Sequence, residues 1–186
     1  MENKRLFISL PINSALGKGI LKDFQQLKLP WEKMKNVELD NLHINLKFLG
    51  TVNLEKLPEL LNSLEQLDTD ITKLEIEINK TAIFNPRHPQ TLVLNIKENK
   101  KLQKLFTDIE NQLFDDGLAH KEIRKFTPHI TLARVKKTTE LREFKEFQDW
   151  TINKSFEVDY FELIESELGN NGPLYTTLQT FNLSTL

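Results

Sequence analysis

The stretches LHINLKFLG (residues 42–50) and TPHITLARV (residues 127–135) repeat one short pattern in two distant parts of the chain. Each contains a histidine, a polar side chain two positions later, and aliphatic residues between and after them. Because side chains alternate between the two faces of a β-strand, each stretch can bury its aliphatic row and present the polar pair on the other face. Both stretches are therefore predicted to be half-buried strands.

The first polar pair is His43 with Asn45, and the second is His129 with Thr131. The elements around the two pairs follow one another in a similar order, which indicates an internal duplication whose second half starts near residue 90. If the two halves pack about a pseudo-twofold axis, the two polar pairs meet in one cleft. The motifs therefore predict a site that is nearly symmetric.

Hydrophobic periodicity predicts a mixed order of strands and helices, which is typical of an α+β fold with antiparallel sheet covered by helices. No long linker is evident, and residues 1–186 are expected to form a single domain. In numbers, the predicted strands cover 5–12, 42–49, 73–80, 91–96, 129–135, 156–164 and 174–181, and the predicted helices cover 14–28, 53–67, 99–116 and 138–148.

Composition narrows the class of function. The chain of 186 residues has a formal net charge of -2 and no cysteine. The charge argues against a global field that attracts long nucleic acids, whereas a local anion site stays open. The lack of cysteine excludes disulfides, thiolate catalysis and cysteine-based zinc sites, and it fits a cytoplasmic location. No apolar run is long enough to span a bilayer, so no membrane association is expected.

Two histidines that face one ligand suit general acid–base catalysis, because imidazole titrates near neutral pH. Phosphoryl chemistry also needs donors for the non-bridging oxygens, and the Asn45 amide and the Thr131 hydroxyl can supply them. Arg134 could add a cationic fork. Strict alternation places Arg134 on the face opposite His129, so it reaches the site only if the strand bulges, twists or ends there.

Other uses of the histidines have less support. A single histidine in a strand is usually a structural or surface residue, and the case for catalysis depends on the matched pair. A metal site is not favoured, because no carboxylate lies beside either motif on the same face and no helical histidine pair exists. His88 lies in a proline-flanked turn and His120 follows a glycine near a helix end, so both are expected to be solvated.

At these residues the sequence resembles the two-histidine phosphoesterases, and within them the RNA 2′,3′-cyclic phosphodiesterases, also called 2′-5′ RNA ligases. The resemblance runs nearly from end to end, and the combination of segments is more specific than any one of them. The segments that carry it are RLFISLPI (5–12), DNLHINLKFLG (40–50), FNPRHPQTLVLNI (84–96), FTPHITLAR (126–134) and ESELGNNGPLYTTLQTFNL (165–183).

The resemblance implies a bilobal fold: two pseudo-symmetric, interleaved lobes with helices outside and both motifs in a central cleft. It also implies hydrolysis of an RNA terminal 2′,3′-cyclic phosphate to a 2′-phosphomonoester, without metal or other cofactor. His43 would be the proton donor to the departing 3′-oxygen and His129 the proton acceptor that activates water. Asn45 and Thr131 would hold the phosphate. The family has threonine where this chain has Asn45, so the first-motif contact is expected to be reshaped by the longer, planar amide.

Further residues gain candidate roles from their places beside the motifs. Phe48 is expected on the His43 face, where it either caps the core or stacks on a base. Lys47 is expected on the opposite face and in solvent. Tyr175 and Trp31 are candidates for the cleft rim, with core packing as the favoured use of each.

Three functions stay open at this point. The first is the cyclic phosphodiesterase; the second is a 2′-5′ RNA ligase or 2′-5′ phosphodiesterase that uses the same residues. The third is a protein that binds RNA ends or nucleotides with weak catalysis, which the unusual Asn45 favours. In each case the expected partner is an RNA 3′ end or a small cyclic-phosphate nucleotide, and the expected state is a monomer.

Overall fold

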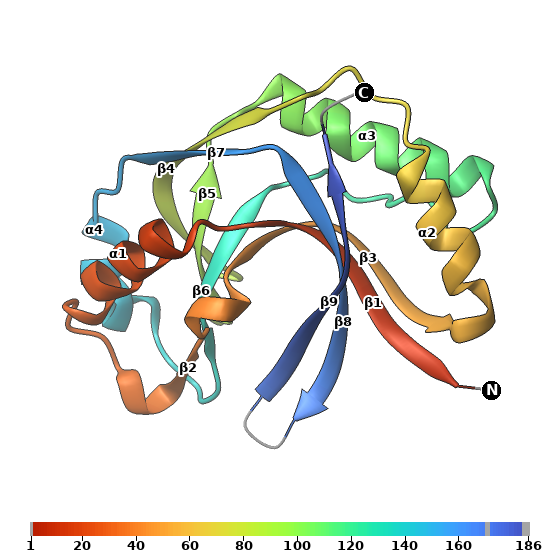
Figure 1. Ribbon diagram of the computed structural model, residues 1–186. Coiled ribbons are helices and arrows are strands. Elements are labelled where there is room, and N and C mark those ends of the chain that lie inside the picture. Colours follow the sequence, from red (N-terminus) through yellow and green to blue (C-terminus); the bar gives the residue numbers. More distant parts are fainter. Residues whose placement is uncertain (1, 170–171, 184–186) are drawn as a thin grey trace.

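The computed structural model describes residues 2–169 and 172–183 and contains one curled sheet with helices on its outer side (Figure 1). Nine strands form this sheet in the order β7-β4-β5-β6-β3-β1-β8-β9, with β2 paired to β6. All strand pairs are antiparallel. The strands are β1 (Asn3–Pro11), β2 (Met34–Asn36), β3 (His43–Asn53), β4 (Leu74–Phe84), β5 (Thr91–Ile96), β6 (His129–Val135), β7 (Lys154–Val158), β8 (Tyr160–Gly169) and β9 (Gly172–Asn182), and the α-helices are α1 (Ser14–Gln25), α2 (Leu57–Glu65), α3 (Lys100–Asp115) and α4 (Lys145–Asp149).

The two motif strands, β3 and β6, lie next to each other in the middle of the sheet. Their pairing is limited to one register position, Ile44 opposite Ile130. Strands β1, β8 and β9 follow on the β3 side, and β5, β4 and β7 follow on the β6 side. The α+β class with two lobes is therefore confirmed, and the seam between the lobes passes between the two histidine motifs.

Each side of the sheet contains strands that are distant from one another in the chain. In the β3 lobe, β1 and β3 are joined by the carboxy-terminal strands β8 and β9, and in the β6 lobe, β5 and β6 are joined by β4. The interleaving of the two lobes stays a prediction. The internal duplication itself stays a prediction.

The helices pair in the same crosswise manner. α1 contacts α4 through Phe24 and Phe147, whose ring centroids lie 5.8 Å apart. α2 contacts the end of α3, where the Ser63 hydroxyl donates to Asp116 over 2.6 Å. The asparagine side chains of Asn13 and Asn99 accept backbone N–H groups at the starts of α1 and α3, the usual capping arrangement. These caps fix where the two helices begin beside the sheet.

One predicted strand is wrong. The range 156–164 was expected as a single strand, but it contains the end of β7 and the start of β8, which lie at opposite sides of the sheet. β7 pairs with β4 through Val158 and Leu74, and β8 pairs with β9 through Tyr160 and Asn182. Apolar alternation continues across Asp159 although the partner strands change, so the local pattern does not reveal the break.

Three smaller differences concern element bounds. β4 continues to Phe84, beyond its predicted end at residue 80. The helix expected over 138–148 begins as a 3-10 turn at Leu141 and becomes α-helical only at Lys145. β2 was not predicted at all, because three residues are too few to show a period. The turn expected at 169–173 includes residues 170–171, which lie outside the described range.

Candidate active site

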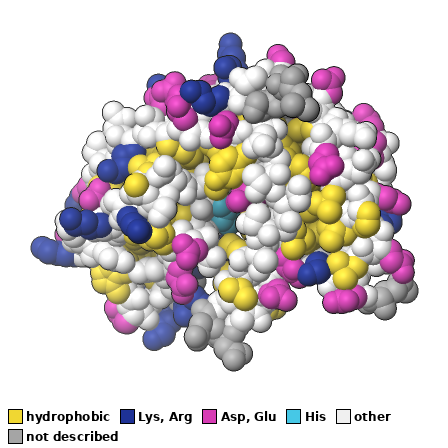
Figure 2. Space-filling view, viewed as in Figure 1, with side chains coloured by type: hydrophobic (Ala, Val, Ile, Leu, Met, Phe, Trp, Pro, Cys, Tyr) yellow, Lys and Arg dark blue, Asp and Glu magenta, His cyan; other side chains and the backbone are white. Residues whose placement is uncertain are grey.

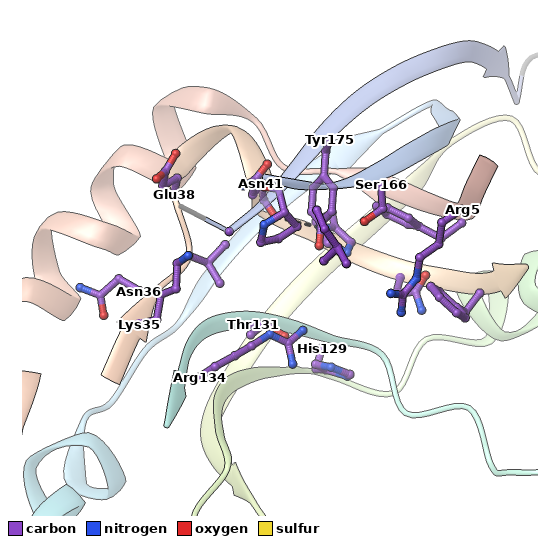
Figure 3. Close-up of a pocket in the computed structure, with 18 residues that line it drawn as sticks. Arg5, Lys35, Asn36, Glu38, Asn41, His129, Thr131, Arg134, Ser166 and Tyr175 are labelled. Carbon is purple, nitrogen blue, oxygen red and sulfur yellow. Dashed lines mark hydrogen bonds between the residues drawn. The ribbon is translucent and has the colours of Figure 1, made fainter. Parts of the chain in front are cut away.

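A cavity of about 370 Å³ opens at the seam between the two lobes. Figure 2 shows the hollow in the middle of one face, with a histidine side chain at its floor. His43 and Asn45 of β3 line it together with His129, Thr131 and Arg134 of β6. In the close-up, Thr131, Arg134 and His129 lie on one wall, and Asn41, Tyr175 and Ser166 lie on the wall opposite (Figure 3). The structure thus brings the two predicted polar pairs into one cavity.

Both imidazoles are held in the same way. His43 Nδ1 lies 2.8 Å from the backbone oxygen of Asn41, and His129 Nδ1 lies 2.8 Å from that of Thr127. A carbonyl oxygen can only accept, so Nδ1 carries the proton in both rings. Nε2 of each ring is then the atom that can exchange a proton with a ligand, as general acid–base catalysis requires.

The surroundings of the two rings differ. The His43 ring packs against Phe7 and Tyr175, with centroid distances of 5.0 Å and 5.5 Å. The ring contact of His129 is with Phe84, at 4.7 Å. Tyr175 therefore lines the cavity as well as packing, whereas Trp31 packs on Phe24, the use that the sequence favoured for it.

Burial lowers the pKa of both histidines below the ordinary value of 6.5. For His43, the positive charges of His129 and Arg134 act in the same direction, and for His129 the charge of Arg134 does so. The hydrogen bonds to Asn41 and Thr127 act in the opposite direction, because they stabilise the cationic rings. Without a bound anion, both rings therefore favour the neutral form at pH 7.

Arg134 reaches the cavity because β6 bulges. Across β5, Val93 pairs with Thr131 but Leu92 pairs with Ala133, so Leu132 is the extra residue. Leu132 and Ala133 are both buried, and alternation resumes one position late. This puts Arg134 on the His129 face. The bulge is one of the irregularities that the sequence analysis required for Arg134 to reach the site.

β3 bulges at the equivalent place. Ser9 of β1 pairs with Asn45 but Ile8 pairs with Lys47, which leaves Leu46 as the extra residue. Phe48 is an odd number of positions from His43, so strict alternation would put it on the other face. The bulge brings it to the cavity, and the residue is 51% exposed. The expected face of Phe48 is confirmed, and core capping is excluded as its main use.

The prediction that Lys47 is solvated is wrong. Its side chain is only 5% exposed and forms an ion pair with Glu110 of α3. Its Nζ also donates to the backbone oxygen of His120 over 2.8 Å. The bulge turns Lys47 towards α3, and burial of this cation is tolerated because both partners accept hydrogen bonds from it.

Asn45 and Thr131 occupy corresponding, half-buried positions on the cavity wall. Among the described residues, the buried Asn45 Oδ1 has no hydrogen-bond partner. A buried acceptor without a partner costs about 1–3 kcal/mol, so this amide is poised to bind a donor from a ligand.

Several lining residues were missed. Arg5 and Phe7 lie on β1, Lys35 lies on β2, and Ser166 lies on β8. Alternation in RLFISLPI places Arg5, Phe7 and Ser9 on one face opposite three aliphatic residues, so this signal could have found the first two. Lys35 and Ser166 come from elements whose pairing partners are distant in sequence, and no local signal marks them.

His88 and His120 have exposed side chains, as predicted. Within residues 2–169 and 172–183, no group of three or more His, Cys, Asp or Glu side chains is arranged to hold a metal ion. No helix in the same part of the chain is long and apolar enough to cross a membrane.

Comparison with known proteins gives one consistent family. Residues 19–170 match the model of the 2′-5′ RNA ligase superfamily. A protein of Methanocaldococcus jannaschii named RNA 2′,3′-cyclic phosphodiesterase is 31% identical over 94% of this chain and 98% of its own. A protein of Bacillus subtilis with the same name is 31% identical, with 96% of each chain covered. The family resemblance seen in the motifs is thereby confirmed.

Solved structures share the fold. A crystal structure of a Thermus thermophilus protein superposes with a TM-score of 0.80 at 24% identity and covers 96% of this chain and 97% of its own. The structure of E. coli LigT complexed with 3′-AMP gives a TM-score of 0.77 at 23% identity, with 99% and 100% covered. Fold, motifs and sequence identity agree: the chain belongs to the 2′-5′ RNA ligase superfamily.

Proposed function

We propose that the protein hydrolyses the 2′,3′-cyclic phosphate at RNA 3′ ends to a 2′-phosphomonoester, without a metal. The observation that carries this proposal is the pair of imidazoles whose Nδ1 atoms are tied to backbone carbonyls while the rings line one cavity. The names of the relatives from Methanocaldococcus jannaschii and Bacillus subtilis support the substrate class.

In this mechanism the two histidines act at opposite ends of an in-line displacement. His129 Nε2 accepts a proton from water as the water oxygen bonds to phosphorus. His43 Nε2 donates a proton to the 3′-oxygen as the bond from that oxygen to phosphorus breaks. The phosphate charge offsets the desolvation that lowers the pKa of His43, so substrate binding itself favours the protonated donor.

Three side chains are suited to hold the phosphate. The Thr131 hydroxyl, the Asn45 amide and the Arg134 guanidinium are all donors on the cavity wall. Arg134 adds a positive charge, and charge-assisted hydrogen bonds are about twice as strong as neutral ones. They would stabilise the negative charge that develops on the non-bridging oxygens.

Phe48 is suited to contact the base of the terminal nucleotide. One face of its ring is covered by the Arg5 guanidinium, at 4.9 Å from the centroid. Phe48 is 51% exposed and lines the cavity, so part of its ring is accessible to a ligand. A base stacked there would extend the Arg5–Phe48 stack.

The experiment is an assay in EDTA with a short RNA that ends in a 2′,3′-cyclic phosphate. Product analysis must separate the 2′-phosphate from the 3′-phosphate. Accumulation of the 2′-phosphate alone is expected. A 3′-phosphate product would contradict the assigned roles of the histidines, and tight binding without turnover would favour an RNA-end binding protein. We still expect a monomer located in the cytoplasm. Light scattering of the purified protein checks the oligomeric state.

A further inference from the structure

A second cavity, of about 580 Å³, adjoins the first. Asn45, Phe48 and His129 line both cavities, so the two share a wall at the proposed phosphate site. The second cavity extends from this wall towards α3 and towards the connection between α3 and β6. A ligand that fills both would pass directly beside the His129 ring.

The wall of the second cavity is fixed although residues 118–128 contain no helix or strand. The buried Lys47–Glu110 ion pair lies beneath it. Lys47 donates to the backbone oxygen of His120, and the backbone N–H of Glu122 donates to Glu110 over 2.6 Å. These bonds hold the 118–128 segment against α3 and give the cavity a defined shape.

The lining of this cavity combines aromatic rings with an excess of positive charge. Phe106 and Phe126 stack with centroids 4.2 Å apart and an interplanar angle of 7°. Four cationic side chains line the cavity against two carboxylates, and these carboxylates pair with Lys47 and Arg124, so the excess positive charge comes from Lys121 and Lys125. The cationic side chains are Lys47, Lys121, Arg124 and Lys125.

We propose that the second cavity binds a second nucleotide of single-stranded RNA; this rests on the proposed function. Single-stranded RNA is held by aromatic rings that contact bases and by cationic side chains that contact phosphates, and both are present here. The volume is in the range of small-ligand sites. The formal charge of -2 for the whole chain makes this local cationic excess stand out.

The second nucleotide has two sources. It is either the upstream neighbour of the cyclic phosphate in the same strand, or the first nucleotide of another strand with a 5′-hydroxyl. In the second case the 5′-oxygen replaces water: it bonds to phosphorus, its proton passes to His129, and the bond to the 3′-oxygen breaks with a proton from His43. The product is a 2′-5′ linkage with a free 3′-hydroxyl.

The test uses the full chain with the exposed pair Arg124→Ala and Lys125→Ala changed together. The matched control is Lys100→Ala with Lys101→Ala at the start of α3, an equal change in charge at residues that line neither cavity. Each protein is assayed for hydrolysis of a 2′,3′-cyclic mononucleotide and of a pentaribonucleotide that ends in a 2′,3′-cyclic phosphate. Joining of that pentamer to a 5′-hydroxyl oligonucleotide is measured in parallel.

We expect the pair at 124 and 125 to lower the ratio of kcat/KM for pentamer over mononucleotide by about tenfold, as for loss of a hydrogen bond to a charged group. The control keeps the wild-type ratio. A lower ratio identifies the upstream nucleotide, and an unchanged ratio with less joined product identifies the 5′-hydroxyl strand. If neither changes, the proposal is overturned.

A binding measurement separates this proposal from the proposed function. A fluorescent pentaribonucleotide that ends in a 3′-phosphate is titrated with each protein at several salt concentrations. The changed pair should bind more weakly, with a salt slope smaller by about one for each lost phosphate contact. If the variant at 124 and 125 and the control variant bind this RNA with equal affinity, the second cavity is not an RNA site. This outcome does not depend on whether the protein hydrolyses a cyclic phosphate.

Discussion

The β3 and β6 sides of the cleft use one backbone design with different side chains. On each side a histidine opens the strand, its Nδ1 meets the carbonyl two residues earlier, and a bulge follows three residues later. The bulge then turns the residue two positions beyond the extra one into the cleft. This residue is Phe48 on the β3 side and Arg134 on the β6 side.

The difference between the two sides suits them to different roles in proton transfer. The β3 side is apolar, because Phe7 and Tyr175 enclose the His43 ring and Phe48 extends the surface. The β6 side carries the charge of Arg134, which adds to the effect of burial in lowering the pKa of both histidines. The backbone makes two equal positions for imidazole, and the side chains around them can make one a donor and the other an acceptor.

The largest effect is expected from removing either imidazole. His43→Ala and His129→Ala should each lower kcat by about 10²–10⁴-fold, the usual contribution of general acid–base catalysis. Steady-state kinetics on a cyclic-phosphate RNA gives the value, and circular dichroism shows whether each variant folds. If both variants fold and turn over substrate at the wild-type rate, the two histidines are not the acid and the base, and the comparison of the β3 and β6 sides has no catalytic meaning.

The pH profile tests which side is the acid. The base must be neutral, so kcat/KM falls as pH drops below the pKa of His129, and the acid must be protonated, so kcat/KM falls as pH rises above the pKa of His43. Both pKa values are lowered, which places the expected maximum below pH 6.5. In His43→Ala the fall at high pH should disappear, and loss of the fall at low pH instead would reverse the roles.

Lys47 and Ala133 occupy corresponding positions, and only the first is charged. Lys47→Met should destabilise the fold by about 3–5 kcal/mol, because Glu110 is left as a buried charge without a partner. Adding Glu110→Gln should recover much of this loss. Urea unfolding measures both, with Lys97→Met as the control, since its ion pair with Glu77 is exposed and should matter little.

Arg134→Gln is expected to lower kcat/KM by about 10–100-fold, since it removes a charge-assisted contact to the phosphate. It should also raise the pKa of His129 part of the way towards its ordinary value, because burial still lowers this pKa but the charge of Arg134 no longer adds to that effect. The pH profile of kcat/KM would then shift to higher pH. Arg134→Lys keeps the charge and serves as the control for this shift, so an equal shift in both variants would contradict the electrostatic cause.

The smallest effect is expected from Asn45→Thr, which makes the two polar pairs alike. Threonine removes the buried amide oxygen that has no partner among the described residues, so stability should rise by about 1 kcal/mol. Turnover should stay within a few-fold of the wild type. Thermal unfolding and kinetics check the two parts, and a severe loss of turnover would show that the Asn45 amide has a task that a hydroxyl cannot perform.

The sequence by itself determined the two motif strands and the pairing of their polar side chains. Each of these depends on alternation over a few residues, which is a local property of an extended backbone. The aliphatic rows Leu42, Ile44, Leu46 and Ile130, Leu132 are buried as the pattern required. The helices predicted over 14–28 and 99–116 start within one residue of α1 and α3 for the same local reason, since the cap that begins a helix involves only neighbouring residues.

Only the tertiary structure decided which side chains join the histidines. The bulges at Leu46 and Leu132 depend on the register with β1 and β5, and they turn Phe48 and Arg134 into the cleft. The division at Asp159 depends on two partner strands at opposite sides of the sheet. Strand pairing is a contact between residues far apart in the chain, so alternation along one strand cannot specify it.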